Sequence, residues 1–405
     1  MSSKPAHAKP GDEHRKKRVK KEVLNIIPTK APLPTPKDSE KQDRILAQKE
    51  AALRRKLSAE NLPSICMYTL FNATESQNIA ALCSSIAEDS SMIAIGFSNS
   101  TIRVWALTPA NLKQLKQAHE LEDLDKEADD IVKQMYDEAN TFDTKALCGH
   151  SGPVYGVSFS PCRQFLLSCS EDSTIRLWSL QTWTNVCVYK GHCFPIWHVE
   201  FCPHGYYFAS CSYDKTARVW ATEHHQPLRV YVGHTSDVDI VKFHPSSNIL
   251  ATGSSDTTIM LWDVIDGSSL KTLTGHDSRI TSMVFSTDGK FLVSCGADRR
   301  FIVWEHNVGH KLAEFDLDTD AMSSMTFSRC GAILATGSID DRVYLWDFLH
   351  LLDEIDTDDL SVCSAPKVFQ NVRAVLLASY RTKNTSLLNL TFTRRNLLLA
   401  SGMAH

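Results

Sequence analysis

The chain has 405 residues, a formal net charge of −4, 43% hydrophobic residues and 22% charged residues, an ordinary composition for a soluble globular protein. No stretch reaches the apolar length that a membrane-spanning helix needs, and the basic start lacks the apolar segment of a secretory signal. The sequence therefore predicts neither a membrane span nor a secreted protein, and favours the cytosol or the nucleus.

The first 60 residues differ from the rest in charge. They hold 16 Lys and Arg against 8 Asp and Glu, a balance of +8, so the other 345 residues hold 27 against 39, a balance of −12. Six of the fifteen prolines also lie here, which predicts a disordered basic tail, with a short helix from Ser39 to Ala59. A basic cluster in the tail is a candidate nuclear import signal, with a solvated linker as the alternative: Arg15, Lys16, Lys17, Arg18, Lys20 and Lys21.

Leu62 begins a strand-like run, LPSICMYTLFN, and a degenerate repeat follows it and ends at Trp105. In this repeat Asn99 and Ile95 stand where later repeats have Asp and Ser or Thr, which predicts a unit held by apolar packing. An acidic insertion near residues 107–145 comes next. Its apolar spacing predicts an amphipathic helix on a docking surface, and an acidic mobile loop is the alternative.

From residue 149 the chain repeats itself. Five tryptophans follow at intervals of 42 residues, at Trp178, Trp220, Trp262, Trp304 and Trp346, and a glycine-histidine pair opens each of the first four repeats. Each repeat offers three or four short apolar runs separated by turn residues, which predicts short strands. A period of about 40 to 45 residues with these signatures resembles the WD-repeat family, whose repeats form the blades of a β-propeller.

The end of the chain holds a second insertion, near residues 348–371, and then a partial repeat. Because Phe lies 19 residues before Trp in the other repeats, Phe392 would place the Trp of this repeat at position 411, beyond the printed sequence. We therefore expect the strand that starts at Leu62 to complete the seventh blade and close the ring, which removes open sheet edges. The predicted fold is all-β, a seven-bladed WD-repeat propeller over residues 61–405.

The resemblance also implies a structural hydrogen-bond network within each blade, from His through Ser or Thr and Asp to Trp. In this chain a Ser or Thr lies 10 residues before each Trp and an Asp 6 residues before it, and the fifth repeat lacks only the His. The implied network residues are His150, Ser168, Asp172 and Trp178; His192, Ser210, Asp214 and Trp220; His234, Thr252, Asp256 and Trp262; His276, Ser294, Asp298 and Trp304; and Thr336, Asp340 and Trp346.

His, Ser and Asp are also the residues of a hydrolytic triad. A nucleophilic site is usually singular, whereas this set recurs four times at one spacing, which favours a structural role. Outside the repeats the sequence has no recognisable nucleophile, phosphate-binding loop or metal-ligand set, and its twelve cysteines include no C-x-x-C pair. The sequence therefore predicts a protein that is not an enzyme and has no cofactor, no metal and no small-molecule substrate.

Several segments are more specific than a generic WD repeat. LPSICMYTLFN, GHSGPVYGVSFSP, DVDIVKFHPSSNILATGS and FTRRNLLLASG resemble the propeller domain of the TBP-associated factor subunit five family of TFIID, which has a paralogue in the SAGA coactivator. The resemblance implies a nuclear scaffold of an RNA polymerase II initiation complex, whose propeller docks histone-fold subunits. It does not extend to the family's N-terminal LisH motif and helical domain, so we expect a fragment, a short isoform or a divergent paralogue.

Residues 23 positions before each Trp are expected at the mouth of the central channel, where propellers usually bind partners. Two of them are aromatic, Tyr155 and Trp197, and with Tyr213 they are the candidate partner-binding residues. The alternative is that Tyr155 and Trp197 fill gaps between blades.

Two other partner classes are less well supported by the sequence. The balance of −12 outside the tail disfavours specific nucleic-acid binding by the propeller, since it would repel phosphates. A substrate receptor of a ubiquitin ligase, or another WD-repeat adaptor, is the alternative function. Receptors that bind phosphate need Arg around the channel, and no Arg occupies the position before the turn Asp in the five regular repeats.

Overall fold

The computed structural model describes residues 57–58, 61–70, 79–108, 112–116, 120–121, 134–316, 321–356, 367–369, 375–382 and 384–404. The chain divides into two units, Met1–Arg54 and Arg55–His405. The predicted tail, its helix and its basic cluster lie outside the described residues, except for Leu57 and Ser58, which are not helical. In the described ranges, no helix is long and apolar enough to cross a membrane.

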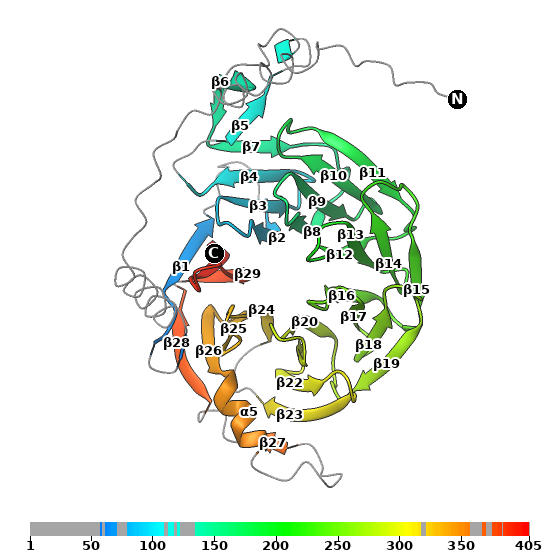
Figure 1. Cartoon of the computed structure of the whole chain (residues 1–405), viewed down its shortest axis with the longest axis vertical. Coiled ribbons are helices and arrows are strands. Elements are labelled where there is room, and N and C mark those ends of the chain that lie inside the picture. Colours follow the sequence, from blue (N-terminus) through cyan, green and yellow to red (C-terminus); the bar gives the residue numbers. More distant parts are fainter. Residues whose placement is uncertain are drawn as a thin grey trace, which may run out of the picture. The chain divides into compact units, whose positions relative to one another are not determined.

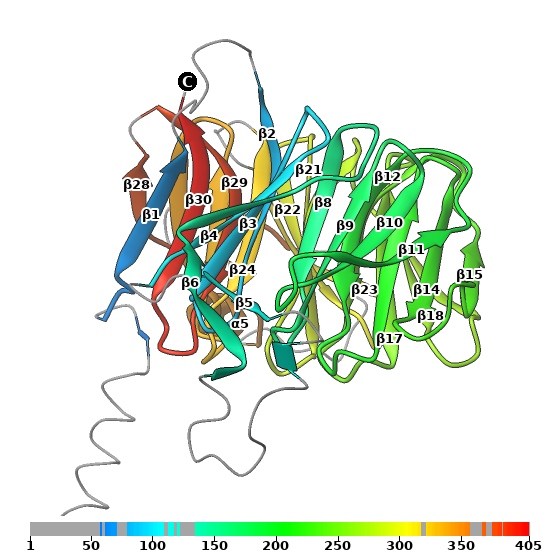
Figure 2. The same cartoon turned by 90° about the horizontal axis from the view of Figure 1, so that it is seen from above.

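The second unit is a ring of seven β-sheets, the blades of a propeller, which confirms the predicted fold (Figure 1). We number the blades 1 to 7 by their innermost strands, which follow one another around the ring as β2, β8, β12, β16, β20, β24 and β29. In the edge-on view the strands run from one face of the ring to the other (Figure 2).

The strands of blades 1 to 4, from the innermost outwards, are as follows. Blade 1 holds β2 (Ala81–Ile86), β3 (Met92–Phe97), β4 (Ile102–Ala106) and β7 (Thr144–Leu147); blade 2 holds β8 (Val154–Phe159), β9 (Phe165–Ser170), β10 (Thr174–Ser179) and β11 (Asn185–Lys190); blade 3 holds β12 (Ile196–Phe201), β13 (Tyr207–Ser212), β14 (Thr216–Ala221) and β15 (Arg229–Val232); blade 4 holds β16 (Val238–Phe243), β17 (Ile249–Ser254), β18 (Thr258–Asp263) and β19 (Ser269–Thr274).

The remaining blades include two sheets that distant segments extend. Blade 5 holds β20 (Ile280–Phe285), β21 (Phe291–Gly296), β22 (Arg300–Glu305), β23 (His310–Asp316) and β27 (Lys367–Phe369); blade 6 holds β24 (Met322–Phe327), β25 (Ile333–Ser338), β26 (Arg342–Asp347) and β28 (Leu376–Arg381); blade 7 holds β29 (Thr385–Phe392), β30 (Leu398–Ala404) and β1 (Ile65–Leu70).

The core of the propeller lies between neighbouring blades. The second strand of each regular blade is covered on both faces, so β13, β17 and β21 are buried at every residue after the first. A strand with two buried faces does not alternate between apolar and polar residues. This explains the continuous runs of apolar and small residues, such as FLLSCS in β9, on which the repeats are built.

Strand β1 closes the ring, as the sequence predicted. It lies beside β30 at the outer edge of blade 7, with Ile65 opposite Leu398 and Leu70 opposite Met403. The pairing is parallel, whereas the third strand of blades 1 to 6 runs antiparallel to the second. Strand β1 therefore completes blade 7, but it runs in the direction opposite to that of the third strand in the regular repeats.

Both insertions add strands. In the described part of the first insertion, β5 (Leu112–Leu115) and β6 (Tyr136–Phe142) form an antiparallel pair, and the amphipathic helix expected here falls largely on residues outside the described ones. The indole N–H of Trp183 donates to the Lys113 carbonyl at 3.1 Å, which attaches β5 to blade 2. The second insertion forms α5 (Phe348–Asp356), and its strand β27 then pairs in parallel with β23 of blade 5 (Figure 1).

Blade 1 replaces the polar network by packing. Ile95 is fully buried at the position that holds Ser or Thr in the regular blades. Asn99 still stabilises the turn between β3 and β4, because its side-chain oxygen accepts hydrogen bonds from the Thr101 backbone N–H and hydroxyl at 3.2 and 2.6 Å.

Candidate functional site

The implied His, Ser, Asp and Trp of blade 3 form one continuous hydrogen-bonded chain. Nδ1 of His192 lies 2.7 Å from Oδ2 of Asp214, and Nε2 lies 2.9 Å from Oγ of Ser210. The indole N–H of Trp220 donates to the same Ser210 oxygen at 2.9 Å. Every polar atom of the set therefore has a partner, as buried polar groups require.

The same chain recurs in blades 2, 4 and 5. His150, His234 and His276 each lie 2.9 Å from their Asp, and each Trp indole donates to its Ser or Thr at 2.8 Å. The glycine before each His is needed for space: a Cβ on Gly191 would lie 2.8 Å from Cη2 of Trp220. The structure thus places the implied residues in four equivalent positions.

The chain of donors fixes the protonation of the imidazole. Since the indole N–H uses Ser210 as its acceptor, the Ser210 hydroxyl can donate to Nε2 of His192, and Nδ1–H then donates to Asp214. Burial lowers the pKa of His192, with Asp214 opposing this effect. Burial raises the pKa of Asp214, but the hydrogen bonds from His192 and Thr216 outweigh it and hold the pKa below its ordinary value. The imidazole is therefore neutral and the Asp214 carboxylate ionised at neutral pH, so the donors and acceptors of the chain match.

Blade 6 lacks the His and uses another donor. Trp346 still donates to Thr336 at 2.9 Å. Asp340 instead accepts a hydrogen bond from the Tyr344 hydroxyl at 3.1 Å. Tyr344 is not among the residues predicted from the sequence, although its place four residues after the turn Asp is visible there.

A channel of about 900 Å³ runs along the innermost strands. Two alternating positions of each regular repeat contribute to its wall, 22 and 20 residues before the Trp, as His198 and Glu200 are before Trp220. Successive strand residues point to opposite faces, so the side chains at these two positions lie on the same side of each innermost strand. Most of these side chains are small, hydroxylic or apolar.

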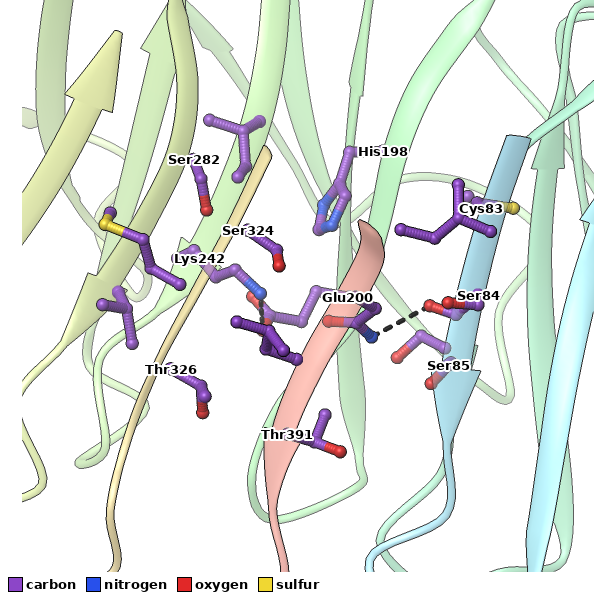
Figure 3. Close-up of a pocket in the computed structure, with 18 of the residues that line it drawn as sticks. Cys83, Ser84, Ser85, His198, Glu200, Lys242, Ser282, Ser324, Thr326 and Thr391 are labelled. Carbon is purple, nitrogen blue, oxygen red and sulfur yellow. Dashed lines mark hydrogen bonds and ion pairs between the residues drawn. The ribbon is translucent and has the colours of Figure 1, made fainter. Parts of the chain in front are cut away.

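An ion pair between blades 3 and 4 lies in the channel wall. Nζ of Lys242 lies 2.9 Å from Oε1 of Glu200, and both side chains project into the channel beside His198 (Figure 3). Glu200 also accepts the Phe243 backbone N–H at 3.1 Å, which joins blades 3 and 4. Withdrawal from bulk water lowers the pKa of His198 to about 3, and the nearby Lys242 charge adds to this effect.

The pKa of His198 predicts an acid-sensitive fold. An unfolded His binds a proton as the pH falls through about 6.5, whereas folded His198 stays neutral until about pH 3. The unfolded state therefore gains protons first, and stability falls with the pH from about 6.5 downward. In thermal melts, His198→Gln should remove about 2 kcal/mol of the stability loss between pH 7 and pH 5. Equal losses in both proteins would contradict this prediction.

The candidate partner-binding residues lie at the face of the propeller where the innermost strands begin. The rings of Tyr155 and Trp197, on neighbouring blades 2 and 3, are in contact, with 4.9 Å between their centroids. Trp197 also packs against the core cluster between blades 3 and 4, so it fills part of a gap between blades as well. The ring of Tyr213 contacts the ring of Phe194, with 5.8 Å between their centroids, and not the rings of Tyr155 and Trp197. Sequence reasoning missed Phe194, which is about half exposed, 50% of its surface being accessible.

A second polar cluster lies where the innermost strands end, at the ring closure. Glu88 of blade 1 forms ion pairs with Arg329 of blade 6 and with Arg394 of blade 7, the latter at 3.1 Å. These hydrogen bonds outweigh burial and lower the pKa of Glu88, the bond from Arg394 having the largest effect. Arg394 belongs to the FTRRN segment on which the family resemblance rests, but its partner could not be identified from spacing alone.

The repeats match a known family. The model of the WD domain, G-beta repeat, matches residues 142–179, 183–221, 225–263, 267–305 and 309–347. Each match ends with the third strand of one of the regular blades 2 to 6 and begins at or near the outermost strand of the blade before it. The family model does not match the inner three strands of blade 1 or any strand of blade 7, and these blades are identified from the structure.

The chain is also similar to curated proteins of transcription complexes. It is 48% identical over 159 residues, 39% of this chain, to transcription initiation factor TFIID subunit 5 of Drosophila melanogaster, and 38% identical over 159 residues to SAGA complex/transcription factor TFIID complex subunit Taf5 of Schizosaccharomyces pombe. A human relative, TAF5-like RNA polymerase II p300/CBP-associated factor-associated factor 65 kDa subunit 5L, is 38% identical over 154 residues, 36% of this chain.

The matches cover 22%, 21% and 25% of the lengths of these relatives, respectively, so they concern only a part of each protein. Three observations indicate the same fold family: the matched repeats, the seven blades and the hydrogen-bond network that recurs in the blades. The chain is therefore a WD-repeat β-propeller protein, with a repeat region similar to that of TFIID subunit 5.

Proposed function

We propose that this chain is a non-catalytic scaffold subunit of a transcription initiation complex of the TFIID or SAGA type, and that its propeller docks histone-fold subunits. The observation that carries the proposal is the identity of 48% over 159 residues to a protein named TFIID subunit 5. The structure is compatible with a scaffold, because the repeated His, Ser and Asp are held by one another as parts of the blades.

The test is affinity purification of the tagged full chain from nuclear extract, followed by mass spectrometry. We expect histone-fold subunits of a transcription complex among the recovered proteins. A chain carrying Asp214→Ala, which is expected to weaken blade 3, is the control for recovery that depends on a folded propeller. Recovery of cullin-type ligase subunits without histone-fold subunits would instead support a ubiquitin ligase receptor and contradict the proposal.

A nuclear scaffold also needs a route into the nucleus, for which the basic cluster at residues 15–21 is the candidate. Replacing its six basic residues by serine should move a fluorescent fusion of the chain from the nucleus to the cytoplasm. The matched control replaces Arg54, Arg55 and Lys56 by serine and should stay nuclear. Unchanged nuclear fluorescence in the six-residue variant would assign import to another segment.

A further inference from the structure

Every innermost strand begins with the same irregularity. The pairing of the first and second strands skips one residue on the innermost strand, so that residue forms a β-bulge. A bulge re-aims its side chain and interrupts regular pairing. The seven bulged residues are Leu82, Tyr155, Trp197, Asp239, Thr281, Ser323 and Leu388. The fold thus presents one equivalent side chain per blade at this mouth of the channel, and the sequence varies only its chemistry.

The bulged residues of blades 2, 3 and 4 differ from the others. Tyr155 and Trp197 make the aromatic contact described above, and Asp239 follows on the next blade. Glu171 flanks the other side, because its Oε2 accepts a hydrogen bond from the Tyr155 hydroxyl at 3.4 Å. One arc of the mouth therefore places two aromatic rings between two carboxylates, whereas the bulged residues of the other four blades are hydroxylic or aliphatic.

We propose that the arc formed by Tyr155, Trp197, Asp239 and Glu171 is a binding site for a lysine or arginine side chain of a partner protein. Aromatic faces attract cations, and a neighbouring carboxylate adds charge complementarity. This combination disfavours an acidic or phosphorylated ligand, which the two carboxylates would repel.

The surroundings of Asp239 support this choice. Burial raises the pKa of Asp239, and the nearby Asp237 carboxylate adds to the effect, while the Ser255 hydroxyl, 2.6 Å away, and Arg279 oppose it. Within the described residues Asp239 and Arg279 form no ion pair, so the carboxylate is available for a cation from outside. A bound ammonium or guanidinium group would relieve the repulsion between Asp237 and Asp239.

A further feature fits a peptide that carries the basic side chain. Phe194 and Tyr213, which lie on the same blade, are 50% and 52% exposed and can cover the neighbouring residues of the peptide. The inference concerns the chemistry of the ligand and does not depend on the complex to which the chain belongs.

The test is a titration of the purified full chain with a fluorescein-labelled glycine-rich peptide that has one central lysine, followed by fluorescence anisotropy. Peptides with arginine or acetyl-lysine at that position show whether the charge is needed. We expect lysine or arginine to bind at least about tenfold more tightly than acetyl-lysine. Equal binding of the lysine and acetyl-lysine peptides would overturn the proposal.

The variant Asp239→Asn removes the charge but retains an oxygen for the Ser255 hydroxyl, and Trp197→Ala removes the aromatic face. Both should weaken lysine binding about tenfold, whereas Ser323→Ala, at the equivalent bulge across the ring, should leave it unchanged. Thermal melts of Asp239→Asn separate loss of binding from loss of folding. Undiminished binding by a folded Asp239→Asn chain would overturn the assignment.

The chain's own basic cluster is another possible occupant. It is tested by replacing the six basic residues at 15–21 with serine in the otherwise complete chain. Unchanged peptide affinity supports an external ligand, whereas affinity that rises strongly would assign the site to the chain's own tail and overturn the proposed partner. Because these experiments use purified components, their failure leaves the affinity purification result untouched.

Discussion

Replacing Asp214 by Ala is expected to lower the free energy of unfolding by about 3 kcal/mol. The substitution removes the acceptor of the His192 Nδ1–H, which is then buried without a partner. It also removes the oxygen that holds the turn between β13 and β14 through the Thr216 backbone N–H and hydroxyl, at 3.0 and 2.6 Å. Lys215 in that turn has a φ of 66°, so the backbone needs this support. Denaturant unfolding at neutral pH measures the change.

The matched control is Asp340→Ala, the equivalent position in blade 6. Asp340 accepts the Tyr344 hydroxyl but has no His to leave unpaired. Its removal should therefore cost clearly less, about 1 kcal/mol. If both variants lose the same stability, the buried His is not the reason that the Asp is needed, and the network argument fails.

The period of the sequence was enough to predict the ring. Once Trp178 and Trp220 are aligned, every strand of the regular blades follows, because each repeat buries the same positions against its neighbours. The same alignment could also have identified the channel, since Glu200 and Lys242 occupy one repeat position on adjacent blades. The sequence therefore contains the signal for the channel wall as well as for the blades.

Other features could not be predicted from a single repeat. The bulges depend on how the first and second strands pair, and the apolar alternation of VYGVSF is equally compatible with a regular strand. The parallel direction of β1 depends on which edge of blade 7 remains open after the chain has folded. Strand β27 is only three residues long, and its partner β23 lies about 50 residues earlier, too far for local sequence patterns to specify.

Replacing both Cys66 and Met67 by Pro is expected to open the ring and to lower the free energy of unfolding by about 5 kcal/mol. Adjacent residues of a strand direct their N–H groups to opposite sides, so one of the two prolines removes an N–H that faces β30. Side chains of β1 also pack on both sides: Ile65 and Met67 against the cluster between blades 6 and 7, and Tyr68 and Leu70 against the cluster between blades 7 and 1.

The control uses the other parallel edge strand, with Lys367→Pro and Val368→Pro in β27. Blade 5 already has four strands without β27, whereas blade 7 has only two without β1. The β27 variant should therefore unfold close to the wild type, while the β1 variant should also expose the edge of β30 and self-associate in size-exclusion chromatography. A monomeric β1 variant with wild-type stability would mean that blades 1 and 7 hold together through their own contacts, such as the Glu88–Arg394 ion pair and the 2.6 Å hydrogen bond between Ser84 and Ser401.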